Sequence, residues 1–181
     1  LRRKWKVQRD CSRRGYTTDQ VLEELDRRER DSELYIRPQR EWADMVVSFM
    51  PGNEQDQLDA MLTLSAGLNH PDLGPLLRVE DVEGEGGGHT VSIPGDINPA
   101  KAAEVEEGVW ERMHFANHLR TERLGEFTIG TDLHRSESLA IVQVLVLYHL
   151  ATARAAVALG GKGSRADRGP GSRPDTAEAP S

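Results

Sequence analysis

The sequence predicts an α/β fold, because it combines strand-length apolar runs with amphipathic helical patterns. Residues 43–50 (ADMVVSFM) form a near-continuous apolar run that ends at Pro51, the pattern of a strand covered on both faces. Residues 89–93 (HTVSI) alternate with period two, as a half-buried strand does. From Ala102 to Ala116, apolar residues recur at three- and four-residue spacing, which places one face of a helix in a core.

Charge is distributed unevenly along the chain. The 181 residues carry a formal charge of -7. Residues 1–16 hold seven Lys or Arg and one Asp, whereas residues 41–112 hold three basic and fifteen acidic residues. The single cysteine, Cys11, excludes an intrachain disulfide framework and fits a reducing cytoplasm, where we expect the protein to be. The chain starts with Leu-Arg-Arg-Lys and lacks the apolar segment of a secretory signal, so we interpret it as entered partway.

Two helices are predicted before the first strand. Residues 4–14 form a short basic helix that Gly15 ends, because glycine adopts the left-handed conformation of a helix end at low cost. Thr17, with Gln20 three residues later, predicts the capped start of a second helix. The buried face of that helix would consist of Val21, Leu22 and Leu25.

Further strands and two more helices are predicted after the first strand. Residues 57–64 and 76–82 are candidate strands. Asn98 followed by Pro99 opens a helix, because proline is favoured at the first helical position. The last helix begins near Ser136.

The last helix carries a long apolar stretch, residues 139–150. Gln143 and His149 interrupt it, whereas a membrane span needs about 20 uninterrupted apolar residues. We therefore expect no membrane association and a buried packing or dimer helix. Residues 160–181 are rich in Gly, Pro, Ser, Ala and charge without periodicity, so we expect a disordered tail.

The basic first helix is a candidate phosphate site. At 100° per residue, four of its cations fall within about 60° of one another. They are Arg2, Lys6, Arg9 and Arg13, with Arg14 beside them next to Gly15. Such cations at a glycine hinge suit a phosphoryl-transfer lid, because charge on the transferring group must be neutralised while water is excluded. The alternative is a solvated basic face, and the acidic remainder of the chain argues against nucleic-acid binding.

Two other motifs lack the spacing of a ligand site. His114 and His118 stand four apart on a predicted helix, but Phe115 occupies the position where a zinc protease has Glu. A third metal ligand would have to come from His134 or further away, so we expect structural histidines and no metal site. Residues 160–164 (GGKGS) do not form a Walker loop, because neither Ser nor Thr directly follows the lysine.

Four short motifs near the start of the chain carry a family resemblance. They are residues 5–10 (WKVQRD), 14–16 (RGY), 35–39 (YIRPQ) and 43–44 (AD). In order and spacing they resemble the phosphoribulokinase family, whereas the shorter RD, RG and AD pattern is shared with the related uridine kinases. The resemblance is close over residues 4–51 and looser from 57 to about 159.

The resemblance implies the later part of a P-loop-kinase-like fold with a mixed α/β carboxy-terminal subdomain. Residues 1–51 would be the lid helices and last core strand of a kinase domain, residues 52–159 the carboxy-terminal subdomain, and residues 160–181 the tail. The implied reaction transfers the γ-phosphoryl of ATP to ribulose 5-phosphate and gives ribulose 1,5-bisphosphate for the Calvin cycle. ATP and Mg²⁺ are the implied cofactors, and we expect a homodimer.

The resemblance also implies roles for residues of the basic helix. Lys6 and Arg9 would contact the sugar phosphate or the phosphates of ATP. Arg9 and Arg14 would be the catalytic cations, with Arg14 closing over the transferring group. Asp10 and Tyr16 would have positioning roles.

The chain departs from the family in what it lacks. The phosphate-binding loop, catalytic carboxylate and Mg²⁺-binding acid of the family lie in an amino-terminal half without a counterpart in these 181 residues, so we expect this chain alone to be inactive. Two alternatives remain: a uridine kinase-like nucleoside kinase, and a non-catalytic association fragment that uses the apolar helix around residues 139–150. Light-regulated relatives switch through paired cysteines, which Cys11 alone cannot form within this stretch.

Overall fold

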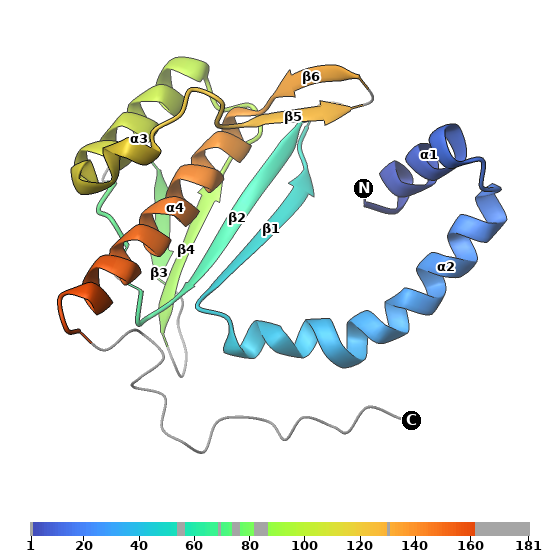
Figure 1. The fold of residues 1–181 in the computed structure, drawn as a ribbon, viewed down its shortest axis with the longest axis horizontal. Helices are drawn as coiled ribbons and strands as arrows, with labels where there is room; N and C mark the ends of the chain where they lie inside the picture. Colours follow the sequence, from blue (N-terminus) through green and yellow to red (C-terminus); the bar gives the residue numbers. More distant parts are fainter. Residues whose placement is uncertain are drawn as a thin grey trace.

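A four-stranded antiparallel sheet with two helices packed on one face forms the main body of the molecule (Figure 1). The strand order is β1-β2-β4-β3, and every neighbouring pair is antiparallel. The strands are β1 (Met45–Pro51), β2 (Leu58–Ser65), β3 (Arg78–Asp81) and β4 (Gly88–Ile93). The computed structural model describes residues 2–53, 57–68, 70–73, 77–81, 87–129 and 131–161.

The core lies between the sheet and helices α3 (Pro99–Arg112) and α4 (Glu137–Ala158). Alternate residues of β2 point into it, because successive side chains of a strand lie on opposite faces. Leu62 and Leu64 are fully buried, and Leu62 pairs with the equally buried Val91 of β4. Burying each such side chain contributes roughly 1.5–3 kcal/mol, so this layer is the main source of stability.

The strand predicted at residues 43–50 is present as β1, but it is not covered on both faces. It lies at the edge of the sheet and pairs only with β2 among the described strands. Met45 and Val47 pack against the core, whereas Phe49 and Met50 are 41% and 43% exposed. An unbroken apolar run is therefore no proof of a central strand. The three other predicted strands are confirmed as β2, β3 and β4, and residues 76 and 82 lie outside the described residues.

Both core helices begin as the sequence predicts. Asn98 caps α3, its side-chain oxygen accepting a hydrogen bond from the Ala100 backbone N–H at 2.8 Å, and Pro99 is the first helical residue. Ser136 caps α4 in the same way through the Leu139 backbone N–H. Between them lie the 3-10 helix η4 (His114–Leu119) and a hairpin of β5 (Glu126–Ile129) and β6 (Asp132–Arg135), which the sequence patterns did not reveal.

In the described part of the chain, α4 is the one helix long and apolar enough to cross a membrane by length and composition. The core helix of a globular domain passes the same test. Its buried residues lie in the first thirteen positions and pack on the sheet and α3, which agrees with the predicted packing helix. Its carboxy-terminal end is more exposed, with Leu150 at 65% and Val157 at 56%.

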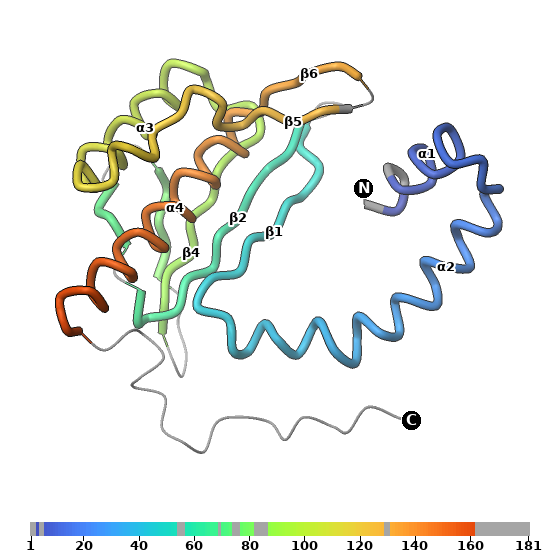
Figure 2. The backbone as a smooth tube through the Cα atoms, in the orientation of Figure 1, coloured from blue at the N-terminus to red at the C-terminus, as the bar shows by residue number. Residues whose placement is uncertain are grey.

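Residues 2–42 form a helical arm that projects from the sheet (Figure 2). It consists of α1 (Arg2–Arg14), α2 (Thr18–Asp31), the π-helix η1 (Ser32–Ile36) and the 3-10 helix η2 (Arg37–Trp42). No described residue of α1 or α2 belongs to the main hydrophobic cluster, although Val21 is buried. The first helix starts at Arg2, two residues earlier than predicted, and both of its predicted boundary signals hold: Gly15 has φ 70° and Thr17 forms a capping box with Gln20.

The predicted domain division stays a prediction. Its boundary between residues 51 and 52 falls in the turn that joins β1 to β2, two strands that pair over seven residues. The predicted disordered tail lies outside the described residues from position 162 onward.

Candidate functional site

Asp10 is the centre of the candidate site on α1. Its residue surface is 5% exposed, and its Oδ1 accepts a hydrogen bond from Arg9 Nε at 2.8 Å. The same oxygen lies 3.6 Å from Arg14 Nη1. The hydrogen bond from Arg9 lowers the pKa of Asp10, and the charges of Arg9, Arg14 and Lys6 act in the same direction. Asp10 is therefore an ionised anchor for two guanidinium groups.

Helix geometry brings these residues together. Arg14 follows Asp10 by four positions, which puts the two side chains on one helix face. Gly15 then takes a left-handed conformation that ends the helix, and the Tyr16 backbone N–H donates to the Asp10 carbonyl at 3.4 Å. Arg14 consequently stands at the helix end, beside the turn into α2, and Arg9 lies earlier on the same helix.

The cations remain available to a ligand. The side chains of Arg9 and Arg14 are 52% and 59% exposed although both contact Asp10. Lys6, one turn earlier, is half-buried, and Tyr16 is 53% exposed. Arginine can grip two phosphate oxygens with parallel N–H donors, so the pair fits an anionic group of this kind. The structure thus brings together Lys6, Arg9, Asp10 and Arg14, and it places Tyr16 just past the helix end.

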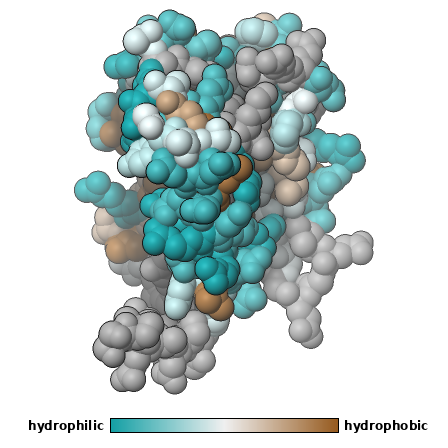
Figure 3. Space-filling view, turned by 90° about the vertical axis from the view of Figure 1, so that its right-hand side faces the viewer, coloured by the Kyte–Doolittle hydropathy of each residue, from teal (hydrophilic) through white to brown (hydrophobic). Residues whose placement is uncertain are grey.

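The surface around the arm is mainly hydrophilic. Figure 3, which shows the molecule from the side on which the arm lies, has a broad hydrophilic region with scattered apolar spots. Several arginines of the arm already have partners, such as Arg27 and Arg28 of α2, which both pair with Glu24. The Asp10 cluster differs from such pairs because its shared carboxylate is buried and its cations are not.

The histidines noted in the sequence do not form a site. His114 and His118 lie in η4, a 3-10 helix rather than the predicted α-helix, with Ala116 outside helical geometry between them. Both side chains are exposed, and so is that of His134 on β6. No group of three or more His, Cys, Asp or Glu in the described segments could hold a metal ion.

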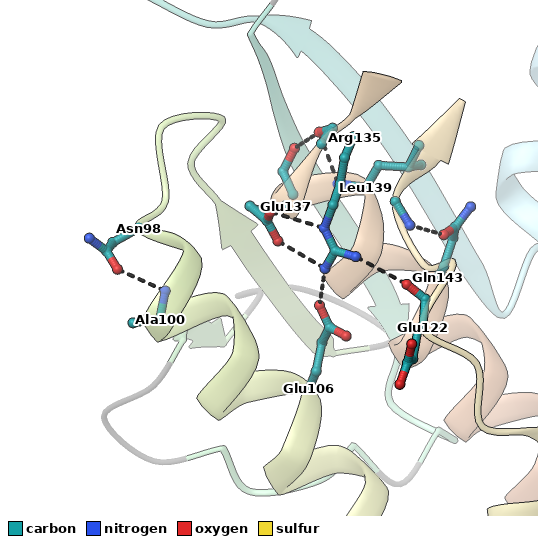
Figure 4. Close-up of polar contacts among 11 residues, drawn as sticks. Asn98, Ala100, Glu106, Glu122, Arg135, Glu137, Leu139 and Gln143 are labelled. Atoms are coloured by element: carbon teal, nitrogen blue, oxygen red, sulfur yellow. Dashed lines mark hydrogen bonds and ion pairs between the residues drawn. The ribbon is translucent and has the colours of Figure 1, made fainter. Parts of the chain in front are cut away.

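A second polar cluster centres on Arg135 (Figure 4). Its guanidinium donates to both Glu137 carboxylate oxygens at 3.0 and 3.2 Å, to Glu106 Oε1 at 3.3 Å and to the Glu122 carbonyl at 3.3 Å. Burial raises the pKa of Glu106, which the charge of Arg135 opposes. Four contacts engage the guanidinium, so this cluster ties the β5–β6 hairpin to α3 and α4 and offers no open cation.

Sequence reasoning missed one buried polar pair. His70 Nδ1 and His149 Nε2 lie 3.3 Å apart, with ring centroids 5.5 Å apart and an interplanar angle of 20°. Burial lowers the pKa of both imidazoles to about 4. The pair joins the segment after β2 to α4. Because 79 positions separate the two residues in the sequence, no local pattern indicates that they are in contact.

Residues 1–56 match the model of the phosphoribulokinase / uridine kinase family. The match contains α1, α2, η1, η2 and β1, and hence every member of the Asp10 cluster. The predicted resemblance to phosphoribulokinase is thereby confirmed for this stretch.

Curated phosphoribulokinases match this chain over short stretches, such as 47 and 82 residues. The Synechocystis enzyme is 40% identical over 47 residues, 26% of this chain and 14% of its own length. The chloroplastic enzymes of Mesembryanthemum crystallinum and spinach are 36% identical over 47 residues and 29% identical over 82 residues, which are 12% and 17% of their lengths. The chain thus spans less than a fifth of these relatives. No solved structure matches it significantly.

Proposed function

We propose that the chain is the carboxy-terminal portion of a phosphoribulokinase, with α1 as part of the lid over the reacting phosphates. The observation that carries the proposal is the Arg9–Asp10–Arg14 cluster within the family-matched segment. The relatives named phosphoribulokinase support ribulose 5-phosphate as acceptor and ATP as phosphoryl donor.

The cluster suits a lid because one carboxylate holds two arginines in place, so the three side chains keep a net positive charge. Phosphoryl transfer develops charge on the transferring oxygens, and fixed cations stabilise that charge without reorganisation. Asp10 orients Arg9 and Arg14 through one buried carboxylate, while more than half of each arginine side chain stays open to a phosphate. In this proposal Arg9 and Arg14 are catalytic, Lys6 contacts a substrate phosphate, and Asp10 and Tyr16 position them.

The described residues do not fit a Mg²⁺ site. Asp10, the one buried carboxylate of the arm among them, is occupied by two arginines, and no cluster of three or more ligating side chains exists in the described ranges. A Mg²⁺ ion would therefore need ligands other than these residues. Turnover also depends on a nucleotide-binding part in addition to them, and we predict that the chain alone does not phosphorylate ribulose 5-phosphate.

A segment exchange tests the proposal in an active context. The 47 residues of the Synechocystis phosphoribulokinase that match this chain are replaced by the corresponding residues of this chain. We expect the chimera to phosphorylate ribulose 5-phosphate with ATP. In that chimera, Arg9→Ala or Arg14→Ala should lower kcat/KM by roughly 100-fold or more, equivalent to about 3 kcal/mol of transition-state stabilisation, with a much smaller loss of stability.

Arg27→Ala is the matched control, since Arg27 is an exposed arginine of the neighbouring helix that pairs with Glu24. It should leave kcat/KM within about twofold, because exposed ion pairs contribute little. Unchanged kinetics in the Arg9 and Arg14 variants would show that both residues belong to a solvated basic face and have no catalytic role. A chimera that phosphorylates uridine in preference to ribulose 5-phosphate would favour a nucleoside kinase.

A further inference from the structure

The outward face of α4 is apolar, like the face that packs on the sheet. On the side opposite the buried Ile141 lie Val146, Leu150, Ala153 and Val157, which are spaced four, three and four residues apart. At 100° per residue these four fall within about 60° of one another, and we call them the α4 seam. A helix that is apolar on all sides is normally buried on all sides, so the α4 seam calls for a cover.

The described residues leave most of the α4 seam uncovered. The outward face is closed at its beginning, where the Gly125 backbone N–H donates to the Gln143 side-chain oxygen at 2.7 Å. Further along, Leu150 and Val157 are 65% and 56% exposed. The arm is too distant to cover them, because it lies at the opposite side of the molecule from the end of α4 (Figure 1).

The segment that follows α4 has the wrong composition for a cover. Residues 162–181 contain no Val, Leu, Ile, Met or aromatic residue and consist of Gly, Pro, Ser, Thr, Ala and charged residues. Such a segment brings almost no apolar surface to an interface, and apolar surface is what the burial of leucine and valine side chains requires. The cover therefore has to come from outside this copy of the chain.

The α4 seam is complementary to itself. Its four-three-four spacing is that of the positions through which two helices pack against each other. Two-fold symmetry brings the same patch of both copies together. In an antiparallel pair centred between positions 150 and 153, Leu150 packs on Ala153 of the partner subunit, and Val146 packs on Val157 of the partner subunit. A large side chain then faces a small one at the centre, which fills the space without a void.

Charge favours the antiparallel direction. Arg154 borders the α4 seam and is the only Lys, Arg, Asp or Glu of α4 besides Glu137. In a parallel pair the two Arg154 side chains would lie at the same level and repel each other. In the antiparallel pair position 154 is level with position 149 of the partner subunit, which separates the two arginines by about 7.5 Å along the helix axes.

We propose that α4 pairs two copies of this chain, antiparallel, through the α4 seam. The pairing is independent of the kinase activity proposed above, because α4 lies outside the family-matched residues 1–56. One helix face is small beside the about 800 Å² per partner of a standard interface, so we expect a dimer that dissociates on dilution.

Sedimentation equilibrium of the full chain over about a hundredfold range of concentration tests the pairing. We expect a reversible monomer–dimer equilibrium. Leu150→Glu places a charge at the centre of the interface in both copies and should raise the dissociation constant roughly 100-fold or more. Because Leu150 is 65% exposed in the single copy, the variant should keep its circular dichroism spectrum.

Leu133→Glu is the matched control, because Leu133 is a leucine of similar exposure, 61%, on β6 rather than α4. It should leave the dissociation constant within about twofold. A chain that is monomeric at every concentration, or a Leu150→Glu variant that dimerises as well as the unsubstituted chain, would overturn the proposal.

Disulfide crosslinking tests the direction of the pair in a Cys11→Ser background. A mixture of the Val146→Cys and Val157→Cys chains should give a crosslinked dimer under oxidation, because the antiparallel pair brings these two positions together. Each variant alone should give none, since its two cysteines would be separated by about 16 Å along the helix axes. A crosslink in either variant alone, or none in the mixture, would contradict the antiparallel pair.

Vesicles of phosphatidylcholine and phosphatidylglycerol test the other occupant that an exposed apolar helix face could have. We expect the chain to stay in solution when it is floated with these vesicles. A monomeric chain that floats with them, and loses this property in the Leu150→Glu variant, would assign the α4 seam to a membrane surface and overturn the pairing of two copies.

Discussion

Acidification should destabilise this protein through the His70–His149 pair. The two ring nitrogens lie 3.3 Å apart, and one imidazole must donate while the other accepts. Burial is the main cause that lowers the pKa of both rings to about 4, and the charges of His149 and His89 add to the effect on His70. Among the described residues, none accepts or donates a hydrogen bond at the buried His70 Nε2 atom, so none of them is placed to stabilise a second proton there.

The size of the effect follows from proton linkage. In the unfolded chain each imidazole titrates near the ordinary pKa of 6.5, so the unfolded state binds more protons than the folded state between pH 6.5 and about 4. The stabilisation is complete above pH 6.5 and is lost as the pH falls. At pH 5, each histidine alone would have lost about 2 kcal/mol relative to pH 7.5. Because His70 is only half-buried and the two sites are coupled, we expect about 2 kcal/mol for the pair.

Urea unfolding at about pH 7.5 and about pH 5, followed by circular dichroism, measures this loss. The double variant His70→Asn/His149→Gln removes both titrating groups, and we expect its loss over the same interval to fall by about 2 kcal/mol. His118→Gln is the control, because His118 is exposed and lies outside the pair. If the double variant loses as much stability on acidification as the unsubstituted chain, the histidine pair is not the acid-sensitive element.

Two single substitutions test the packing of the main body. Gly125 has φ 79°, and a Cβ there would clash with the Ser136 carbonyl oxygen and lie 2.9 Å from Ala140 Cβ, so Gly125→Ala should cost more than about 2 kcal/mol in a thermal melt. A melt within about 1 °C of the unsubstituted chain would contradict this geometry. The buried Ser138 hydroxyl donates to the Leu58 carbonyl at 2.6 Å, so Ser138→Ala should lower the free energy of unfolding by about 1–3 kcal/mol. A change below about 0.5 kcal/mol would mean that water replaces the hydroxyl at that carbonyl.

Local signals in the sequence were sufficient for three helix starts and one helix end. Thr17, Asn98 and Ser136 each provide a side-chain acceptor at a helix start, and each caps the expected helix in the structure. These interactions span two or three residues, so they depend little on the rest of the fold. The same locality explains why Gly15 was identified as the end of α1.

Properties that depend on distant partners were not predictable in this way. The apolar run of β1 is compatible with a central strand or an edge strand, and only its neighbours decide which. The β5–β6 hairpin is short and its β6 residues are exposed, so it has little hydrophobic alternation to detect. The candidate site was predictable only in part. The four-residue spacing of Asp10 and Arg14 is visible in the sequence, whereas the burial of Asp10 depends on how the chain packs.

The attachment of the arm has a consequence for how the molecule responds to perturbation. In the described structure α1 and α2 contribute nothing to the main hydrophobic cluster, and their covalent route to the sheet runs through η1 and η2. The arm and the main body should then be separate cooperative units, with faster amide hydrogen exchange in the arm than in β2 or α4. A ligand that binds the arginines of α1 would slow exchange in the arm while leaving exchange in the core unchanged. Selection can consequently alter the charge chemistry of the arm without a cost to the stability of the sheet.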